Sequence, residues 1–142
     1  MAVRDFLRKA PVTVPPECTL HEAAALMASH GVGCVLVTSG GEIRGIVTDR
    51  DLVVRGVATG RGLDAPVVEV MTADPTTVAG GADIVDAYRT LKDGEFRRLP
   101  VLEEGELAGI VTVDDLVVGL VLELASVLSP VAREVVRPEV RP

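Results

Sequence analysis

The chain has 142 residues, a length that suits one compact domain or two small motifs with a common core. Its net charge is −7, and it contains one Tyr, two Phe and no Trp. Binding to nucleic acid needs a basic surface, and binding to single strands also needs aromatic side chains for stacking. The composition therefore argues against nucleic acid as a partner.

Membrane and disulfide signals are also weak. Residues 1–9 lack the apolar core of a signal peptide. The most apolar run, residues 116–128, is shorter than the ~20 residues that span a bilayer and contains Glu123. Two cysteines, Cys18 and Cys34, are too few for a disulfide framework. We predict a soluble cytoplasmic protein with free buried thiols and no membrane partner.

The first half of the chain predicts the order strand, helix, strand, strand, helix. Thr19 is a helix N-cap residue, and the apolar residues after it recur at the spacing of one helix face. Gly31 ends that helix, and the Gly40-Gly41 pair predicts a hairpin turn. The expected elements are a helical turn within 1–10, a strand at 12–14, a helix over 20–30, strands at 34–37 and 43–47, and a helix from 48 to about 57.

The second half predicts the same order. Residues 58–66 have the composition of a linker, and residues 67–71 form a short element. The expected elements that follow are a strand at 76–78, a helix around 84–91, strands at 99–102 and 107–111, and a helix from 112. We divide the chain into a first motif with its lead-in (1–60), a linker (61–70), a second motif (71–128) and a C-terminal extension (129–142).

A repeated stretch is the clearest evidence for two copies. Gly41–Leu52 and Gly105–Leu116 share the pattern Gly-Glu-x-x-Gly-Ile-Val-Thr-x-x-Asp-Leu. One copy of about 50 residues buries too little surface to be stable alone. We therefore expect an α/β (α+β) fold in which two β-α-β-β-α motifs pack sheet to sheet with pseudo-twofold symmetry. The two motifs would share a core and leave a cleft between their equivalent ends.

The last helix needs more cover than one sheet provides. From Thr112 onward it is apolar on almost every side, and a helix of that kind is covered on more than one face. Two alternatives remain for the second cover. It is either the segment 131–136 or a second subunit, which would make the protein a homodimer.

These features resemble a tandem pair of CBS motifs, the arrangement named after cystathionine β-synthase. The resemblance rests on Gly45–Leu52, on Gly109–Leu116 and on Leu99-Pro100-Val101, and it spans roughly residues 8–126. It implies a regulatory module, commonly dimeric, whose cleft often binds AMP, ADP, ATP or S-adenosylmethionine. We expect no attached enzyme or transporter. The chain is most similar to bacterial stand-alone pairs, including hypoxia-induced proteins with a similar Thr-Asp-Arg-Asp segment.

Two interpretations of Thr48-x-x-Asp51 and Thr112-x-x-Asp115 stay open. Each pair forms a capping box, which satisfies backbone donors at a helix start and contributes about 0.5–2 kcal/mol. A helix start also presents N–H groups to a phosphate, and a carboxylate there accepts hydrogen bonds from ribose hydroxyls. The resemblance implies the second role, because the Thr and Asp of CBS motifs contact the nucleotide.

The resemblance also implies how the rest of the ligand is held. Basic residues just before the second strand reach the phosphates, which singles out Arg97 and Arg98. The alternative is that these arginines pair with Glu95 or Glu103 at the end of the strand. The first copy has Gly33-Cys34 at the matching positions, so we expect the Thr112/Asp115 site to bind phosphate better. The remaining expected contributors are Thr13 and Val14 for the adenine wall of that site, Thr77 and Val78 for the wall of the Thr48/Asp51 site, and Arg50 for added charge.

The competing functions need different residues. We find no nucleophile, base or phosphate-loop pattern, and so predict no enzyme activity and no required cofactor. The preferred function is an adenosine-ligand sensor, linked to energy sensing or a stress response, that acts on an unidentified protein partner. One alternative is an interaction module whose Thr-x-x-Asp pairs are caps only. The other is a zinc-linked stress protein that uses Cys18-x-x-His21, although we prefer to explain that spacing by a buried cysteine beside an exposed helix histidine.

Overall fold

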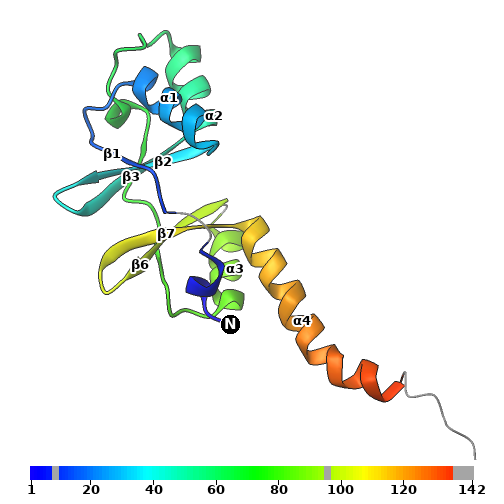
Figure 1. The fold of residues 1–142 in the computed structure, drawn as a ribbon. Coiled ribbons are helices and arrows are strands. Elements are labelled where there is room, and N and C mark those ends of the chain that lie inside the picture. Colours follow the sequence, from blue (N-terminus) through cyan, green and yellow to red (C-terminus); the bar gives the residue numbers. More distant parts are fainter. Residues whose placement is uncertain (8–9, 95–96, 136–142) are drawn as a thin grey trace, which may run out of the picture.

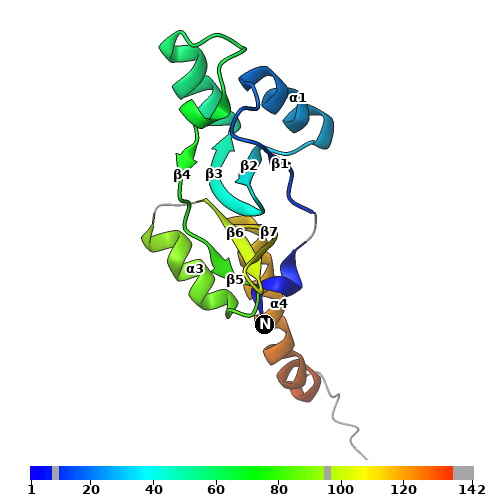
Figure 2. The ribbon, with the colours of Figure 1, turned by 90° about the vertical axis from the view of Figure 1, so that its left-hand side faces the viewer.

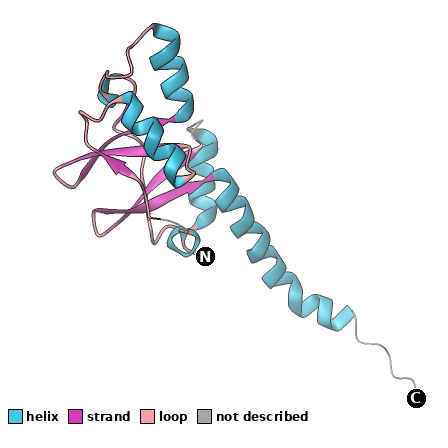
Figure 3. Cartoon of the chain, turned by 45° about the horizontal axis from the view of Figure 1, so that its top comes forward, coloured by secondary structure: helices cyan, strands magenta, loops and turns pink. Residues whose placement is uncertain are grey.

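The protein folds into two α+β motifs stacked one on the other, as the repeat predicts (Figure 1). The structure is a computed structural model that describes residues 1–7, 10–94 and 97–135, with only the backbone of 132–135. The two sheets meet where β3 (Glu42–Thr48) contacts β7 (Glu106–Thr112). The helices lie on the outer sides of this pair of sheets (Figure 3). The predicted fold class is confirmed.

The first sheet has four strands in the order β1-β2-β3-β4. β1 (Thr13–Val14) pairs in parallel with β2 (Cys34–Ser39), which pairs antiparallel with β3 through the predicted hairpin. α1 (Leu20–His30) begins at a Thr19 capping box and ends at Gly31 in the left-handed conformation. The second helical segment starts with α2 (Asp49–Asp51) and continues as a π-helix over Leu52–Gly56 and a 3-10 turn over Val57–Thr59.

The second sheet repeats this arrangement with three strands. β5 (Val78–Ala79) pairs in parallel with β6 (Arg98–Glu103), and β6 pairs antiparallel with β7. Both hairpins shift register at the same place, after Val37 and after Val101. α3 (Ile84–Asp93) follows β5, and α4 (Val113–Val135) follows β7. A shared irregularity at equivalent positions is what a duplicated unit predicts.

The motifs exchange their first helical turns. The 3-10 turn at Val3–Phe6 packs on the second motif, where the Val3 N–H donates to the Ala82 carbonyl at 2.9 Å. The equivalent turn at Val67–Glu69 packs on the first motif, where the Val67 N–H donates to the Cys18 carbonyl at 2.7 Å. Each motif is therefore completed by a segment of the other copy. Figure 2 shows β4 (Thr72–Ala73), which follows the second turn, at the edge of the first sheet.

The exchange changes two sequence-based expectations. The buried residues form two core clusters, one within each motif, in place of the single shared core. Val67 and Val70 are fully buried in the first cluster, whereas Val3 and Phe6 belong to the second. The predicted linker 61–70 therefore includes core residues of the first motif, and the lead-in packs on the second. The cause is tertiary: a turn of three or four residues has no core of its own and is stable only against another element.

α4 is longer than the predicted second motif. It runs to Val135 and passes through Pro130, so the first part of the expected C-terminal extension is helix, and residues 136–142 lie outside the described chain. Val131 is part of the same continuous helix and therefore does not fold back to cover it. The helical part of the segment 131–136 does not cover the apolar face of α4 in the way that the first of the two alternatives predicted. Among the described residues, no helix has both the length and the apolar character needed to cross a membrane.

Candidate functional site

Both Thr-x-x-Asp pairs form capping boxes. The Asp51 N–H donates to the Thr48 hydroxyl at 3.1 Å, and the Thr48 N–H donates to Asp51 Oδ2 at 2.9 Å. In the second copy, Asp115 Oδ2 accepts from both the N–H and the hydroxyl of Thr112, at 3.0 and 2.9 Å. The capping interpretation is therefore confirmed. It leaves room for a ligand, because a carboxylate has about four acceptor positions and the helix start remains positively polarised.

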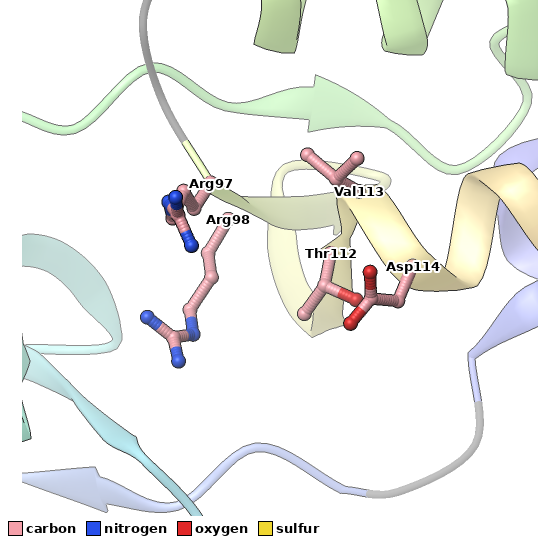
Figure 4. Close-up of a pocket in the computed structure, with 5 residues that line it drawn as sticks. All are labelled: Arg97, Arg98, Thr112, Val113 and Asp114. Atoms are coloured by element: carbon pink, nitrogen blue, oxygen red, sulfur yellow. The ribbon is translucent and has the colours of Figure 1, made fainter.

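Two arginines stand opposite the start of α4. Arg97 precedes β6 and Arg98 opens it, and together with Thr112 and Asp114 they line a cleft of about 320 Å³. Figure 4 shows the Arg98 side chain extending from the strand into the space beside Thr112. The Val113 N–H donates to the Arg97 carbonyl at 3.3 Å and the Asp115 N–H to the Thr112 hydroxyl at 3.2 Å, so the positive charge here comes from the guanidinium and the helix dipole. This combination suits an anion such as a phosphate.

The cleft at Thr112 and Asp115 has an apolar wall from the other motif. Beside Arg98 and these two residues, a space of about 290 Å³ is bordered by Pro11 and Val12. The other residues that border it are Ala10, Val32, Gly33, Cys34, Leu36 and Ile110. This site therefore lies between the motifs and joins a flat apolar surface to a polar end.

The predicted wall residues lie next to the observed ones. The lining of this cleft comes from the segment just before β1, since Val14 is buried in the first core and Thr13 is exposed. The same holds for the other wall: Pro75 and Thr76 line it, and they directly precede Thr77 and Val78.

The second cleft, about 570 Å³, lies at Thr48 and is more polar. Arg50 lines it as expected, and so does Asp49. Arg97 and Arg98 line it as well, so the arginines are shared between the two clefts. The sequence placed them with Thr112 alone. The stacking of the motifs explains the difference, because it brings the start of β6 to the start of α2.

Arg98 enters this position because Gly33 has no side chain. A Cβ built on Gly33 would lie 3.0 Å from an Arg98 terminal nitrogen and 3.4 Å from Asp49 Oδ2. Cys34 is adjacent and nearly buried. Burial raises the pKa of its thiol, Arg98 opposes that rise, and Asp49 adds to it. The Gly33-Cys34 pair, which in the sequence predicts the weaker phosphate site, therefore leaves space for the arginine of the other copy.

The alternative role of Arg97 and Arg98 is an ion pair with Glu95 or Glu103. Glu103 pairs with Arg4 at 3.1 Å, which assigns that carboxylate to the exchanged turn. Glu95 lies outside the described residues. Arg44, another basic residue of the first motif, pairs with Glu42 at 3.3 Å on the exposed hairpin, away from both clefts.

Cys18 and His21 lie at the start of α1. Cys18 is buried and its thiol donates to the Thr19 carbonyl at 3.6 Å, whereas His21 is exposed. Burial, followed by the charge of Glu22, raises the pKa of the Cys18 thiol. Within the described part of the chain, no group of three or more His, Cys, Asp or Glu is arranged to hold a metal ion.

The CBS domain model matches residues 3–57 and 67–121. The chain belongs to the CBS domain family. Each matched range begins at an exchanged turn, so the family unit includes the segment that packs on the other copy. CBS pairs are regulatory modules, and no catalytic family is indicated.

Some of the known relatives are of similar size, whereas others are much longer: the match covers 19% of the Arabidopsis thaliana protein CBSCBSPB5. The CBS domain-containing protein YhcV of Bacillus subtilis is 37% identical over 117 residues, which cover 82% of this chain and 84% of that protein. Hypoxic Response Protein I, solved with two coordinated zinc ions, is 29% identical with a TM-score of 0.73, covering 82% of this chain and 97% of that one. PAE2072 of Pyrobaculum aerophilum, solved in complex with AMP, is 27% identical with a TM-score of 0.78, covering 89% and 99%. The chain is thus similar to stand-alone CBS proteins, among them a hypoxic response protein.

Proposed function

We propose that this CBS pair is a non-catalytic sensor that binds an adenosine ligand between its motifs. The observation that carries the proposal is the composition of one cleft. Arg98, Thr112 and Asp115 border it together with an apolar wall at Pro11 and Val12. Adenine needs an apolar surface, ribose hydroxyls need an acceptor, and a phosphate needs a basic donor. The AMP complex of PAE2072 supports the same ligand class.

The Thr112/Asp115 cleft is the stronger of the two sites. Since Arg98 borders both clefts, and Arg50 and Arg97 also border the cleft at Thr48, the ranking no longer depends on charge. It depends on the apolar wall. The cleft at Thr48 is bordered mainly by threonines and charged residues, so a larger share of its lining is polar than in the cleft at Thr112 and Asp115.

A signal would leave this site through α4. Thr112 and Asp115 cap the start of that helix, so a ligand bound there contacts the element that extends farthest from the motifs. Ligand binding would change the packing of the motifs or of a homodimer, and so the activity of a protein partner. The sensor would work in the cytoplasm, where thiols such as Cys18 and Cys34 stay reduced.

Titration calorimetry with AMP, ATP and S-adenosylmethionine tests the proposal. Asp51→Ala and Asp115→Ala remove equivalent capping boxes, so each is the stability control for the other. We expect Asp115→Ala to weaken binding more than Asp51→Ala at a similar loss of melting temperature. Equal losses of affinity would refute the ranking, and no heat at millimolar ligand would refute nucleotide binding.

The interaction-module and zinc alternatives make different predictions. If the Thr-x-x-Asp pairs are caps only, both Asp variants lower the melting temperature and no nucleotide raises it for the wild type. The observation that favours the zinc function is that Hypoxic Response Protein I was solved with two coordinated zinc ions. Elemental analysis of the purified protein, with Cys18→Ala as control, would detect bound zinc if Cys18 and His21 hold it.

A further inference from the structure

The start of β6 lies on the border between the two clefts. Arg97 and Arg98 line the cleft at Thr48, and both also line the space beside Thr112. Arg98 borders the apolar part of the Thr112/Asp115 cleft as well. Figure 4 shows the two arginine side chains next to each other at the start of the strand. One pair of guanidinium groups is therefore common to both clefts.

The position of Arg98 defines this border. One terminal nitrogen of its guanidinium lies 3.0 Å from the point that a Cβ on Gly33 would occupy, and Asp49 Oδ2 lies 3.4 Å from the same point. Gly33 borders the Thr112/Asp115 cleft, whereas Asp49 lines the cleft at Thr48. The Asp49 N–H donates to the Gly33 carbonyl at 2.9 Å, so the walls of the two clefts meet at this contact. From here the guanidinium can donate to a phosphate in either cleft.

The positive charge at the border is sufficient for one phosphate. A phosphate monoester such as AMP carries a charge of about −1.5 to −2 at neutral pH, which Arg97 and Arg98 together balance. Among the described residues that line the two clefts, the remaining basic one is Arg50, and it follows the acidic Asp49. The residue of the second copy that corresponds to Arg50 is Asp114. A second phosphate would therefore bring more negative charge than these side chains balance.

We propose that the two clefts compete for Arg97 and Arg98, so that a nucleotide phosphate in one cleft weakens the binding of a second nucleotide phosphate in the other. This inference rests on the proposed function, since it concerns the same two clefts. A guanidinium that donates to one phosphate has fewer N–H groups left for another, and two phosphates beside one arginine repel each other. The second ligand loses one charge-assisted hydrogen bond, which corresponds to about 10- to 100-fold in affinity.

The competition determines how the chain responds to its ligand. The Thr112/Asp115 cleft fills first, because it has the apolar wall. The cleft at Thr48 then fills at a ligand concentration about 10- to 100-fold above the one that it would need alone. The coupling between two binding sites is reciprocal, so a phosphate at Thr48 weakens binding at Thr112 by the same factor. A ligand without a phosphate escapes this coupling.

Titration calorimetry of the full chain with AMP tests the competition when one cleft is blocked. Pro11→Trp places an indole in the Thr112/Asp115 cleft, and Pro11 lies in the irregular segment before β1 and does not line the described cleft at Thr48. We expect AMP to bind the cleft at Thr48 about 10- to 100-fold more tightly in Pro11→Trp than in the second phase of the wild-type titration. Asp115→Ala, which removes the ribose acceptor in place of the apolar wall, should shift this affinity in the same direction. The melting temperatures verify that both variants are folded.

Two controls identify the cause of the coupling. Adenosine lacks the phosphate, so its affinity for the cleft at Thr48 should be the same in the wild type and in Pro11→Trp. Arg98→Gln removes one shared guanidinium, so for AMP the ratio of the two affinities should decrease when Pro11→Trp is added to this background. A ratio for adenosine equal to that for AMP, or a ratio that Arg98→Gln leaves unchanged, would overturn the proposal.

The outcomes for AMP separate this inference from the proposed function. No binding of AMP to the wild type would refute both. Equal affinities of the cleft at Thr48 in the wild type and in Pro11→Trp would refute the competition alone, and so would a Pro11→Trp variant that binds no AMP while the wild type does. If the wild type shows one phase of one equivalent and Pro11→Trp still binds one equivalent, the first ligand excludes the second, as the competition predicts.

Discussion

The exchange of first turns makes a quantitative prediction at two equivalent glycines. Gly45 on β3 and Gly109 on β7 each face the turn from the other copy. A Cβ on Gly45 would touch the Met71 side chain and come within 2.9 Å of the Thr72 backbone carbonyl oxygen. A Cβ on Gly109 would come within 2.7 Å of Leu7 Cδ2. Both approaches are closer than real Cβ contacts, so alanine at either position requires a shift.

The two shifts differ in cost. At Gly45 part of the obstacle is backbone, because Gly45 pairs with β4 in the ladder that contains Thr72. We expect the upper end of the overpacking range, about 3 kcal/mol, at Gly45, and about 1 kcal/mol at Gly109, where the end of Leu7 can rotate away. Replacing glycine by alanine also lowers the conformational entropy of the unfolded chain, which stabilises the folded protein by about 0.4–1 kcal/mol. The net loss is therefore about 2 kcal/mol for Gly45→Ala and close to zero for Gly109→Ala.

Differential scanning calorimetry measures the difference. At roughly 4 °C per kcal/mol for a chain of this size, Gly45→Ala should melt about 8 °C below the wild type and Gly109→Ala within about 2 °C of it. Adding Met71→Ala to Gly45→Ala should restore only part of the loss, since the carbonyl of Thr72 remains. Equal melting temperatures for the two glycine variants, or full recovery with Met71→Ala, would show that the backbone of β4 does not limit this contact.

Two further predictions concern the cleft. Arg98→Gln should weaken AMP binding, measured by calorimetry, about 10- to 100-fold, the value of a charge-assisted hydrogen bond, and leave adenosine binding unchanged. The control Arg44→Gln removes the same charge on the exposed hairpin and should leave the binding of both ligands unchanged. An equal loss of adenosine affinity in Arg98→Gln would contradict the phosphate role. Because burial raises the pKa of Cys34, its reactive thiolate is scarce at pH 8 and increases as the pH rises further. In a Cys18→Ala background, alkylation of Cys34 should therefore be slow at pH 8, accelerate toward pH 10 and slow again with AMP; a rate independent of AMP would place the nucleotide elsewhere.

Much of the fold could be predicted because it depends on local chemistry. Thr19 and Glu22 form a reciprocal cap, and the left-handed Gly31 ends the helix they begin. The same reasoning located both Thr-x-x-Asp caps and both hairpins. These features depend on residues a few positions apart, so a single sequence is sufficient to locate them.

Other features depend on contacts between distant segments. The alignment of Val3–Leu7 with Val67–Met71 was present in the repeat, but only the folded chain places each turn on the other copy. The arginines of β6 were assigned to one cleft because their neighbours in sequence lie there. Stacking of the motifs brings Arg98 past Gly33 to the other cleft as well.

By itself, the sequence determined the duplication, the element order, the helix caps and the family. The family follows from the resemblance of the repeated stretch to CBS motifs, and the other three follow from periodicity and from hydrogen bonds between residues near in sequence. The tertiary structure alone decided the exchanged turns, the two separate cores and the sharing of the arginines. It also left the outer half of α4, up to Val131, exposed among the described residues of the chain. These depend on how two copies stack, and many stackings are compatible with one hydrophobic pattern.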